Sequence, residues 1–447
     1  MINKKNLIEY FSEGIKPDNQ LKIGVEHEKF VLNKDTLLPL KYEGEGGILD
    51  IFKSLIDLGW SPINEGETEK IIALQKGSEF ITLEPGGQLE LSGAQLSNIH
   101  QTCTETTNHL NEIKSLSNKF NFILLGIGVE PKLTLEDFPW MPKDRYSIMK
   151  KYMPKVGDLG HHMMKRSCTS QINFDYSSEK DMIKKFRILL NFESIGTAIF
   201  ANSPFDRGKP SKYKSLRSHF WHHTDKDRTG TIPFVFKSEF NFEAYTDYAL
   251  NIPMYFIKRN NEYIDMTSLS FKDFINNKNN SAGGKYEPTI ADWSDHISTL
   301  FPQVRLKQYL EVRSIDACSW KVICSPPAFW TGILYDEESM SEAYRLTQDW
   351  TDEERLFLNL QVPEHGLNTK FRDQTVLQIA NKLLEISEQG LKRRNILSSD
   401  KRYNEVQYLS AVKENLSRGM SPADLLLEKY NGVWKNSLDP LYSDEIF

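Results

Sequence analysis

The chain has 447 residues and a formal net charge of −6 at pH 7, with 55 Lys and Arg against 61 Asp and Glu. Such a chain lacks the positive field that attracts a phosphate backbone, so we expect no nucleic-acid partner. No apolar run approaches the roughly 20 residues of a spanning helix, and the start MINKKNLIEYFSEG lacks the apolar stretch of a signal peptide, so we expect no membrane association and a cytoplasmic location.

The N-terminal part alternates helical and strand patterns. Apolar spacing predicts short helices at about 5–15 and 47–58, and LKIGVEHEKFVL between them predicts a strand. FITLEPGGQLELSG predicts two strand pieces around a Pro-Gly-Gly bend, and CTSQINFDY predicts a further strand. Ser178 and Asp181 form a capping-box-like start for a helix that ends before Ser203.

The character of the sequence changes twice after this helix. Residues 204–300 are rich in aromatic and turn residues without a clear period, so we expect loops and short strands that face a substrate. VRLKQYLEVRSID returns to a strand pattern. After about residue 340 the chain becomes helical, because DQTVLQIANKLLEISEQGLKRR is amphipathic and SPADLLLEKYNG begins with Ser421 as a cap.

Four of the predicted strands carry a polar face, because side chains two positions apart on a strand point the same way. The residues that share faces are Glu26 with Glu28, Gln88 with Glu90, Glu311 with Arg313, and Thr169, Gln171, Asn173 and Asp175 together. Mg²⁺ prefers carboxylate and amide oxygens, so this pattern predicts a magnesium site suited to phosphate chemistry. The alternative is the ordinary solvated face of an antiparallel sheet, which any single pair would fit.

No glycine-rich phosphate loop is present: there is no GxxxxGK[ST], and GIGVEP at 126–131 lacks the third glycine of a dinucleotide motif. If ATP binds, metal and arginine must hold it, and Arg145, Arg217 and Arg313 all stand beside aromatic or apolar residues. Each arginine can equally be a partner in a structural salt bridge.

Histidine and cysteine give weaker signals. The histidine pairs are His161-His162 and His222-His223, and the cysteines are Cys103, Cys168, Cys318 and Cys324. We interpret the histidine pairs as loop residues, because no further ligand follows at a fixed spacing. Four cysteines without a CxxC pair indicate neither a disulfide scaffold nor a zinc site, which leaves redox or packing roles.

A series of long motifs runs from residue 23 to about 340. They are GVEHEKF, GGQLELSG, IHQTC, MPKDRYSIMKKYMPKVG, RSCTSQINFDYSSEKDMIKKFR, ANSPF, LRSHFW, RTGTIPFVF, YALNIPMYF and FPQVRLKQYLEVRSIDAC. In this order the motifs resemble the plant and proteobacterial branch of the glutamate–cysteine ligases. The resemblance implies an α+β fold with a curved six-stranded antiparallel sheet of the glutamine-synthetase-like type and helices around it. We expect a catalytic core over 1–340 and a helical C-terminal region over 341–447 packed on it.

The resemblance also implies roles for single residues. Carried over by position, magnesium ligands fall on Glu26, Glu28, Glu90 and Glu311, with Gln171 as a further polar ligand.

The arginines receive separate roles from the same resemblance. Arg145 and Arg217 match the arginines that hold the substrate glutamate, and Arg313 matches the one that approaches the transferred phosphate, so that Glu311 and Arg313 are the catalytic pair. The implied reaction uses ATP and Mg²⁺: the γ-carboxylate of glutamate attacks the terminal phosphate, and the amine of cysteine displaces the acyl phosphate. The product, γ-glutamylcysteine, is the first intermediate of glutathione biosynthesis.

Two of the cysteines match cysteines of this family, whereas a cysteine specific to the plant enzymes is missing. IHQTC and VICSPPAFW match the two cysteines that pair in this family, which implies a redox-active disulfide between Cys103 and Cys324. The stretch NNKNNSAGGKYEP lacks the cysteine that plant enzymes carry there, so we do not expect the plant-specific disulfide.

Alternatives stay open at this point. The family often has Phe where Leu89 stands, and GHHMM and WHHTD replace GLDMM-like and WTDTD-like sequences, so another amine acceptor is the nearest alternative. A magnesium-dependent phosphate-ester hydrolase would need the metal face but not the glutamate arginines. A catalytically inactive binding protein is disfavoured, because every matched charged position is filled. The oligomeric state is open between monomer and homodimer.

Overall fold

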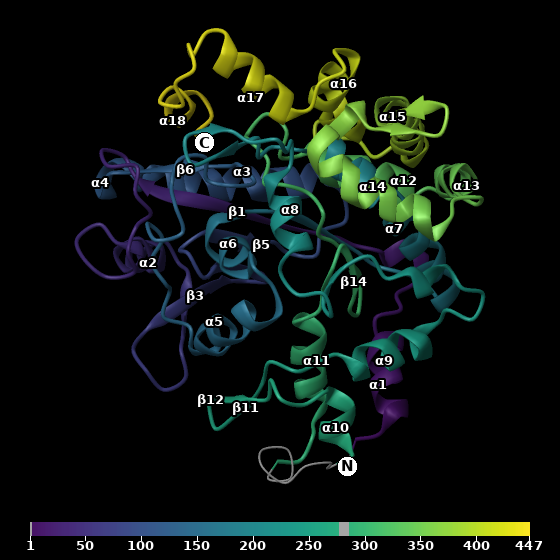
Figure 1. The fold of residues 1–447 in the computed structure, drawn as a ribbon, viewed down its shortest axis with the longest axis horizontal. Coiled ribbons are helices and arrows are strands. Elements are labelled where there is room, and N and C mark those ends of the chain that lie inside the picture. Colours follow the sequence, from purple (N-terminus) through teal and green to yellow (C-terminus); the bar gives the residue numbers. More distant parts are fainter. Residues whose placement is uncertain (1, 277–285) are drawn as a thin grey trace.

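The structure is a computed structural model that describes residues 2–276 and 286–447 (Figure 1). A large antiparallel sheet forms the centre, and helices surround it. Its strands are β1 (Ile23–Asn33), β2 (Ser61–Asn64), β3 (Ile71–Lys76), β4 (Glu79–Leu83), β5 (Leu89–Ser92), β6 (Phe122–Leu125), β7 (Ser170–Phe174), β14 (Val304–Leu306) and β15 (Leu310–Val312). Their order is β14-β15-β7-β1-β5-β4-β3-β2, with β6 pairing β1.

The sheet has nine strands within the described residues, not the six that the resemblance implied. Two segments account for much of the difference. The stretch SPIN of β2 is mostly exposed and shows no apolar alternation, so its pairing with β3 gave no strand signal. The segment VRLKQYLEVRSID forms the two strands of a hairpin, β14 and β15, instead of one strand. The mixed fold and the antiparallel character agree with expectation.

Local signals explain the N-terminal elements. Helix α1 (Lys4–Ser12) begins at a capping box in which Asn3 accepts hydrogen bonds from the backbone of Lys5 and Asn6. In β1 the side chains alternate between faces, so Glu26 and Glu28 share one face while Val25 and Val31 join the main hydrophobic core. The hairpin β4–β5 turns at Gly87, whose φ of +91° favours glycine.

Helix α7 is the longest buried helix near the sheet. It spans Glu179–Ile199, and Ser178 caps it by accepting a hydrogen bond from the Asp181 backbone, as the sequence predicted. Two helices of the region after residue 340, α14 (Asp352–His365) and α15 (Val376–Arg394), pack on it. These helices and α16 (Ser410–Ser417) lie grouped at one end of the molecule (Figure 1).

The remaining helices complete the shell. Before residue 200 they are α1 (Lys4–Ser12), α2 (Ile48–Asp57), α3 (Ile99–Ser115), α4 (Ser117–Phe120), α5 (Asp144–Val156) and α6 (Gly160–Arg166). The C-terminal ones are α12 (Ser325–Leu334), α13 (Glu337–Leu346), α14 (Asp352–His365), α15 (Val376–Arg394), α16 (Ser410–Ser417), α17 (Pro422–Asn431) and α18 (Leu441–Asp444). Ser421 caps α17 as predicted. Among the described residues, no helix has both the length and the apolar character needed to span a bilayer.

The region 204–300 is more helical than the sequence suggested. Besides the short pairs β8 (Phe205–Asp206) with β9 (Lys209–Pro210) and β11 (Phe256–Arg259) with β12 (Glu262–Asp265), it contains α8 (Leu216–His222), α9 (Phe242–Asn251), α10 (Phe271–Ile275) and α11 (Ile290–Ser298). Capping boxes at Ser270 and Thr289 start α10 and α11, which are too short to show a clear apolar period. Most of NNKNNSAGGKYEP lies outside the described residues.

Candidate active site

A pocket of about 190 Å³ opens on the polar face of the central sheet. Its walls come from β1, β5 and β7, from helices α5, α6 and α8, and from the segment at 298–305. Of the eight residues given a metal, substrate or catalytic role from the sequence, all but Glu311 line it: Glu26, Glu28, Glu90, Arg145, Gln171, Arg217 and Arg313. The structure therefore brings together side chains that lie almost 290 positions apart in the chain.

The strand register explains how the acidic residues meet. Glu28 on β1 lies opposite Glu90 on β5, and Glu26 lies opposite Gln171 on β7. Each carboxylate accepts a hydrogen bond from a neighbour: Glu26 from the Asn173 side chain (2.8 Å), Glu28 from the Thr169 backbone (2.9 Å) and Glu90 from the Thr82 hydroxyl (2.7 Å) and, at 3.3 Å, the Ser92 hydroxyl.

Ionising these three carboxyl groups costs free energy in the folded protein, as their raised pKa values show. Burial, together with the charges of Glu311 and Glu90, raises the pKa of Glu26 to about 8. Burial and then the neighbouring Glu84 raise the pKa of Glu28 and of Glu90 above the ordinary carboxyl value. A cation placed among them would relieve both the desolvation and the mutual repulsion.

Glu311 stands apart from that group. It is 1% exposed, and its Oε2 lies 2.6 Å from Arg305 Nη2 and 2.8 Å from Arg313 Nη1. Burial opposes its ionisation, but the charges of Arg305, Arg313 and Lys307 outweigh that effect and hold the pKa of Glu311 well below its usual range. Its side chain is already neutralised by arginine.

The arginines occupy different sides of the pocket. Arg313 donates to both Glu311 and Gln171, and its guanidinium lies 5.7 Å from the centre of the Trp221 ring. Arg217 on α8 is 2% exposed and donates from Nη2 to the Arg313 carbonyl (3.1 Å). Arg145 lines the pocket from α5, and its buried Nε has no partner among the described residues. Most of their donor capacity is left for a ligand.

Two charged lining residues escaped the sequence reasoning. Arg305 on β14 lies directly opposite Glu311 on β15, a relationship visible only once the segment is recognised as a hairpin. Glu84 stands at the bend between β4 and β5 and raises the pKa of two neighbouring carboxyls. Glu84 could have been found from its place in the motif LEPGGQLE, close to the predicted polar-face residues Gln88 and Glu90.

The residue types fit a hard cation better than a soft one. Three carboxylates with raised pKa values, Glu90 buried and Glu26 and Glu28 partly buried, are a donor set of the kind that Mg²⁺ takes. In the part of the chain that the structure describes, however, no three His, Cys, Asp or Glu side chains are already arranged around a metal position. The carboxylates would have to turn toward one another to ligate an ion.

The two histidine pairs lie on helices, which corrects their interpretation as loop residues. His161 and His162 belong to α6, and His222 ends α8 with His223 as its cap. The prediction was wrong because these helices have only seven residues each and no apolar period.

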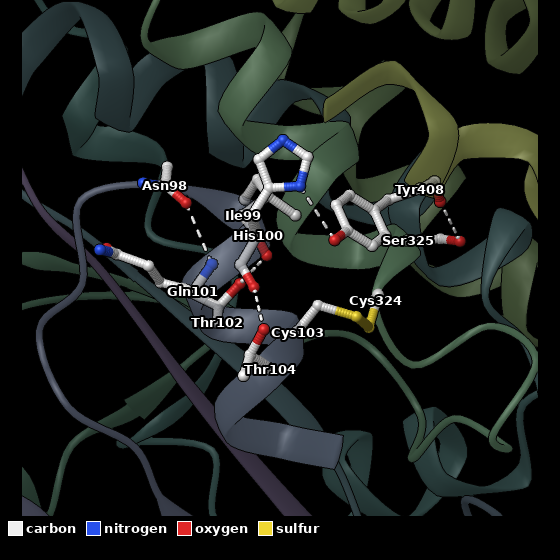
Figure 2. The surroundings of a disulfide bond; sticks show 10 residues. All are labelled: Asn98, Ile99, His100, Gln101, Thr102, Cys103, Thr104, Cys324, Ser325 and Tyr408. Atoms are coloured by element: carbon white, nitrogen blue, oxygen red, sulfur yellow. Dashed lines mark hydrogen bonds between the residues drawn. A yellow bond between two sulfur atoms is a disulfide. The ribbon is translucent and has the colours of Figure 1, made fainter. Parts of the chain in front are cut away.

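A disulfide joins Cys103 on α3 to Cys324, which caps the start of α12 (Figure 2). The two Cα atoms lie 5.6 Å apart. Both sides of the bond also contact Tyr408: His100 is 3.1 Å from its hydroxyl, and the Ser325 hydroxyl donates to its carbonyl (2.7 Å). Whether the bond responds to redox conditions stays a prediction.

Comparison with known proteins gives consistent matches. The sequence model of the glutamate-cysteine ligase family 2 matches residues 22–444. Glutamate–cysteine ligase B, chloroplastic, of Oryza sativa subsp. japonica is 48% identical over 447 residues, covering 100% of this chain and 88% of the relative. Glutamate–cysteine ligase, chloroplastic, of Arabidopsis thaliana is 46% identical over 446 residues, covering 100% of this chain and 83% of the relative.

A solved structure supports the fold. The glutamate–cysteine ligase of Francisella tularensis, in complex with AMP, superposes with a TM-score of 0.52 over 94% of this chain and 86% of that one, at 14% identity. At this identity the match concerns the fold alone. It agrees with the mixed architecture of an antiparallel sheet and surrounding helices.

The cytoplasmic location expected from the sequence is contradicted by these comparisons. The plant relatives are named chloroplastic. The expectation rested on the composition of the first residues, which says nothing about the compartment in which a folded enzyme works.

Proposed function

The chain belongs to the glutamate-cysteine ligase family 2, and from this premise we propose that it joins the γ-carboxylate of glutamate to the amine of cysteine with consumption of ATP. The product is γ-glutamylcysteine, an intermediate of glutathione biosynthesis. The observation that carries the proposal is the pocket, whose lining combines four carboxylates with four arginines. That charge pattern suits a reaction between a dicarboxylic amino acid and a nucleoside triphosphate.

Arg145 and Arg217 are the proposed anchors of the substrate glutamate. A guanidinium grips a carboxylate through two parallel hydrogen bonds, and both side chains keep donors free for this purpose. Arg217 is held by its own hydrogen bond to the Arg313 carbonyl, so its position is coupled to the neighbouring strand. Fixing the substrate in this way brings its γ-carboxylate close to the phosphate without further entropy loss.

Arg313 and Glu311 form the proposed catalytic pair. Arg313 is oriented by Glu311 and Gln171, and we assign to it the stabilisation of charge on the transferring phosphoryl group. Attack by the γ-carboxylate breaks the bond to ADP and forms an acyl phosphate. The cysteine amine then attacks the acyl carbon, phosphate leaves, and the amine loses a proton.

Magnesium is the metal that the residue types favour. Glu26, Glu28 and Glu90, with Gln171 as a further polar group, would hold it, and when bound it would neutralise phosphate oxygens. Glu311 is the weakest member of the expected ligand set, because Arg305 and Arg313 already compensate its charge.

The proposed domain division follows the same picture. Residues 1–340 would form the catalytic core, with the sheet curving around the pocket, and 341–447 a helical region supporting it. The contacts of α14 and α15 with α7 support this arrangement, because α7 also contacts β14 and β15 beside the pocket.

The direct test is ADP formation by the purified protein. We expect ADP only when ATP, Mg²⁺, glutamate and an amine are all present, with cysteine the best acceptor in a panel of amines. Turnover without any amine as fast as the complete reaction would contradict the proposal and favour a phosphate-ester hydrolase. A different best amine would keep the fold and the activation step but change the second substrate.

A further inference from the structure

A second pocket lies on the other side of the helices that wall the candidate active site. It has a volume of about 240 Å³. Helices α6 and α8 pack against each other and contribute to both pockets. The candidate active site uses Met163, Met164, Arg217 and Trp221 from them, and the second pocket uses His162, Arg166, Leu216, His219 and Phe220. One two-helix wall therefore separates the pockets.

Arg166 supplies a buried positive charge to this second pocket. Its side chain is fully buried, with Nη2 donating to Asp206 (2.8 Å) and Nη1 to His162 Nδ1 (3.1 Å). Its Nε, also buried, has no hydrogen-bond partner among the described residues. An unpaired buried donor is costly, and a ligand atom that accepts from it would remove that cost.

Arg207 at the rim adds a second guanidinium in a strained position. It sits in the tight turn between β8 and β9 with a φ of +50°, where asparagine or glycine would fit with less strain. Its side chain is 61% exposed, and its nearest acidic partner is Asp206 at 3.7 Å. Because the backbone is strained at a residue whose side chain is charged and exposed, we infer that this charge has a function.

Lys212 brings a third positive charge to the lining, against Asp206 as the single carboxylate there. Its ammonium also reaches Glu364 at 3.1 Å, a partner outside the lining, so its charge is partly compensated. The charged side chains of the lining therefore sum to a positive charge.

The two histidines of the pocket act as neutral donors. Burial, followed by nearby positive charges, lowers the pKa of His162 and of His219 to about 4. Because His162 Nδ1 accepts from Arg166, its Nε2 carries the proton and can donate. His219 stacks flat on Tyr213, with ring centres 4.2 Å apart. The lining therefore offers hydrogen-bond donors from both charged and neutral groups.

We propose that this second pocket binds a small anion with two or more carboxylate or phosphate groups, held by Arg166 from within and by Arg207 and Lys212 at the rim. Binding would affect the contacts that Arg217 makes with the substrate, because His219 and Phe220 lie on the same short helix as Arg217. The binding step is independent of the proposed ligase activity. The coupling to Arg217 rests on it, since Arg217 is there assigned to the substrate glutamate.

The test of binding uses the full chain without substrates. Citrate and pyrophosphate are titrated by calorimetry, and protein labelled with ¹³C at histidine Cε1 reports on His162 and His219 by NMR. Arg207→Asn removes the rim charge and suits the turn, and Arg313→Gln removes a donor from the other pocket. We expect saturable binding that shifts both histidine signals, is weakened about fivefold or more by Arg207→Asn, and is unchanged by Arg313→Gln.

The outcomes separate the possibilities. Binding of only citrate or only pyrophosphate would support the site and define its ligand as carboxylate or phosphate. No saturable binding, or binding weakened by Arg313→Gln but not by Arg207→Asn, would overturn the proposal by placing the anion in the other pocket or nowhere.

Coupling is measured through the KM for glutamate at constant free Mg²⁺. The anion should change this KM about twofold or more in the wild type and leave Arg207→Asn unchanged, and without anion both proteins should have equal activity. An unchanged KM in the wild type at saturating anion would overturn the coupling. A protein that binds the anion but makes no γ-glutamylcysteine would instead refute the proposed function.

Discussion

Arg305 and Glu311 face each other across the hairpin β14–β15 and form an ion pair of 2.6 Å. Both side chains are almost completely buried, at 5% and 1% exposure. With Arg313 on the other side, the carboxylate of Glu311 is enclosed by two guanidinium groups. Glu311 therefore works first as an anchor that fixes two arginines of the pocket.

Glu311→Gln should affect both catalysis and stability. The substitution keeps the shape of the side chain but leaves Arg305 and Arg313 buried without their countercharge. We expect kcat for ADP formation to fall on the order of 10²-fold and the free energy of unfolding to fall by about 3 kcal/mol. Kinetics and urea unfolding measure the two effects. Glu262→Gln on the exposed strand β12 is the matched control, and near-wild-type activity in folded Glu311→Gln would remove Glu311 from the site.

Arg217→Lys should chiefly raise the KM for glutamate. An ammonium cannot form the paired hydrogen bonds by which a guanidinium holds a carboxylate. Steady-state kinetics with glutamate and with ATP as the varied substrate distinguish the roles, and Arg345→Lys, exposed on α13, serves as control. If only the ATP dependence changed, Arg217 would belong to the phosphate side of the pocket.

Reduction of the Cys103–Cys324 disulfide should alter activity and stability. The bond closes a segment of 221 positions, so its loss should cost about 4–5 kcal/mol by the restraint on the unfolded chain. Peptide maps without reductant, activity and unfolding are compared before and after dithiothreitol in wild type, Cys103→Ser and Cys318→Ser. Cys318 is a buried free thiol, so its variant should respond like wild type. If Cys103→Ser responded to dithiothreitol in the same way as the wild type, the proposed redox role of the disulfide would be refuted.

Glu105 should make the protein less stable as pH rises. Burial raises the pKa of this α3 carboxyl to about 7 from 4.5, although the Ala94 backbone donates to it at 2.7 Å. The folded chain thus holds the proton more tightly than the unfolded chain, and stability falls between pH 4.5 and about 7. Glu105→Gln should remove this slope and add on the order of 2 kcal/mol at pH 8, with little change at pH 4.5.

Urea unfolding at several pH values measures that difference. Glu414→Gln, on the exposed side of α16, is the control and should leave the slope intact. A variant Glu105→Gln that is less stable than wild type at pH 8 would show that the carboxyl is ionised and usefully paired in the folded chain.

Sequence patterns predicted the parts of the site that depend on strand alternation. Glu26, Glu28, Glu90 and Gln171 share a pocket because a period of two fixes the face on which each side chain stands. The family resemblance was confirmed by the match over residues 22–444. The roles of the single residues stay predictions.

Features that depend on pairing between distant segments were missed. Arg305 enters the site through its register with Glu311, and no local pattern marks a turn at 307–309 strongly enough to reveal that hairpin. The helices α6 and α8 escaped detection because their packing against each other, not their propensity, stabilises seven-residue segments. Glu84 required knowledge of how the β4–β5 bend points into the pocket.

The strand order has a consequence for how the protein is made. Strand β7 lies between β1 and β15, so its second edge is paired only by residues 310–312. A nascent chain that has emerged through β7 but not yet through β15 exposes that edge, with its unpaired backbone groups, for the synthesis of more than a hundred residues. The order of strands thus makes a chaperone or a rapid temporary cover for β7 an advantage during translation, and it means that no N-terminal fragment ending before residue 313 can assemble the complete pocket.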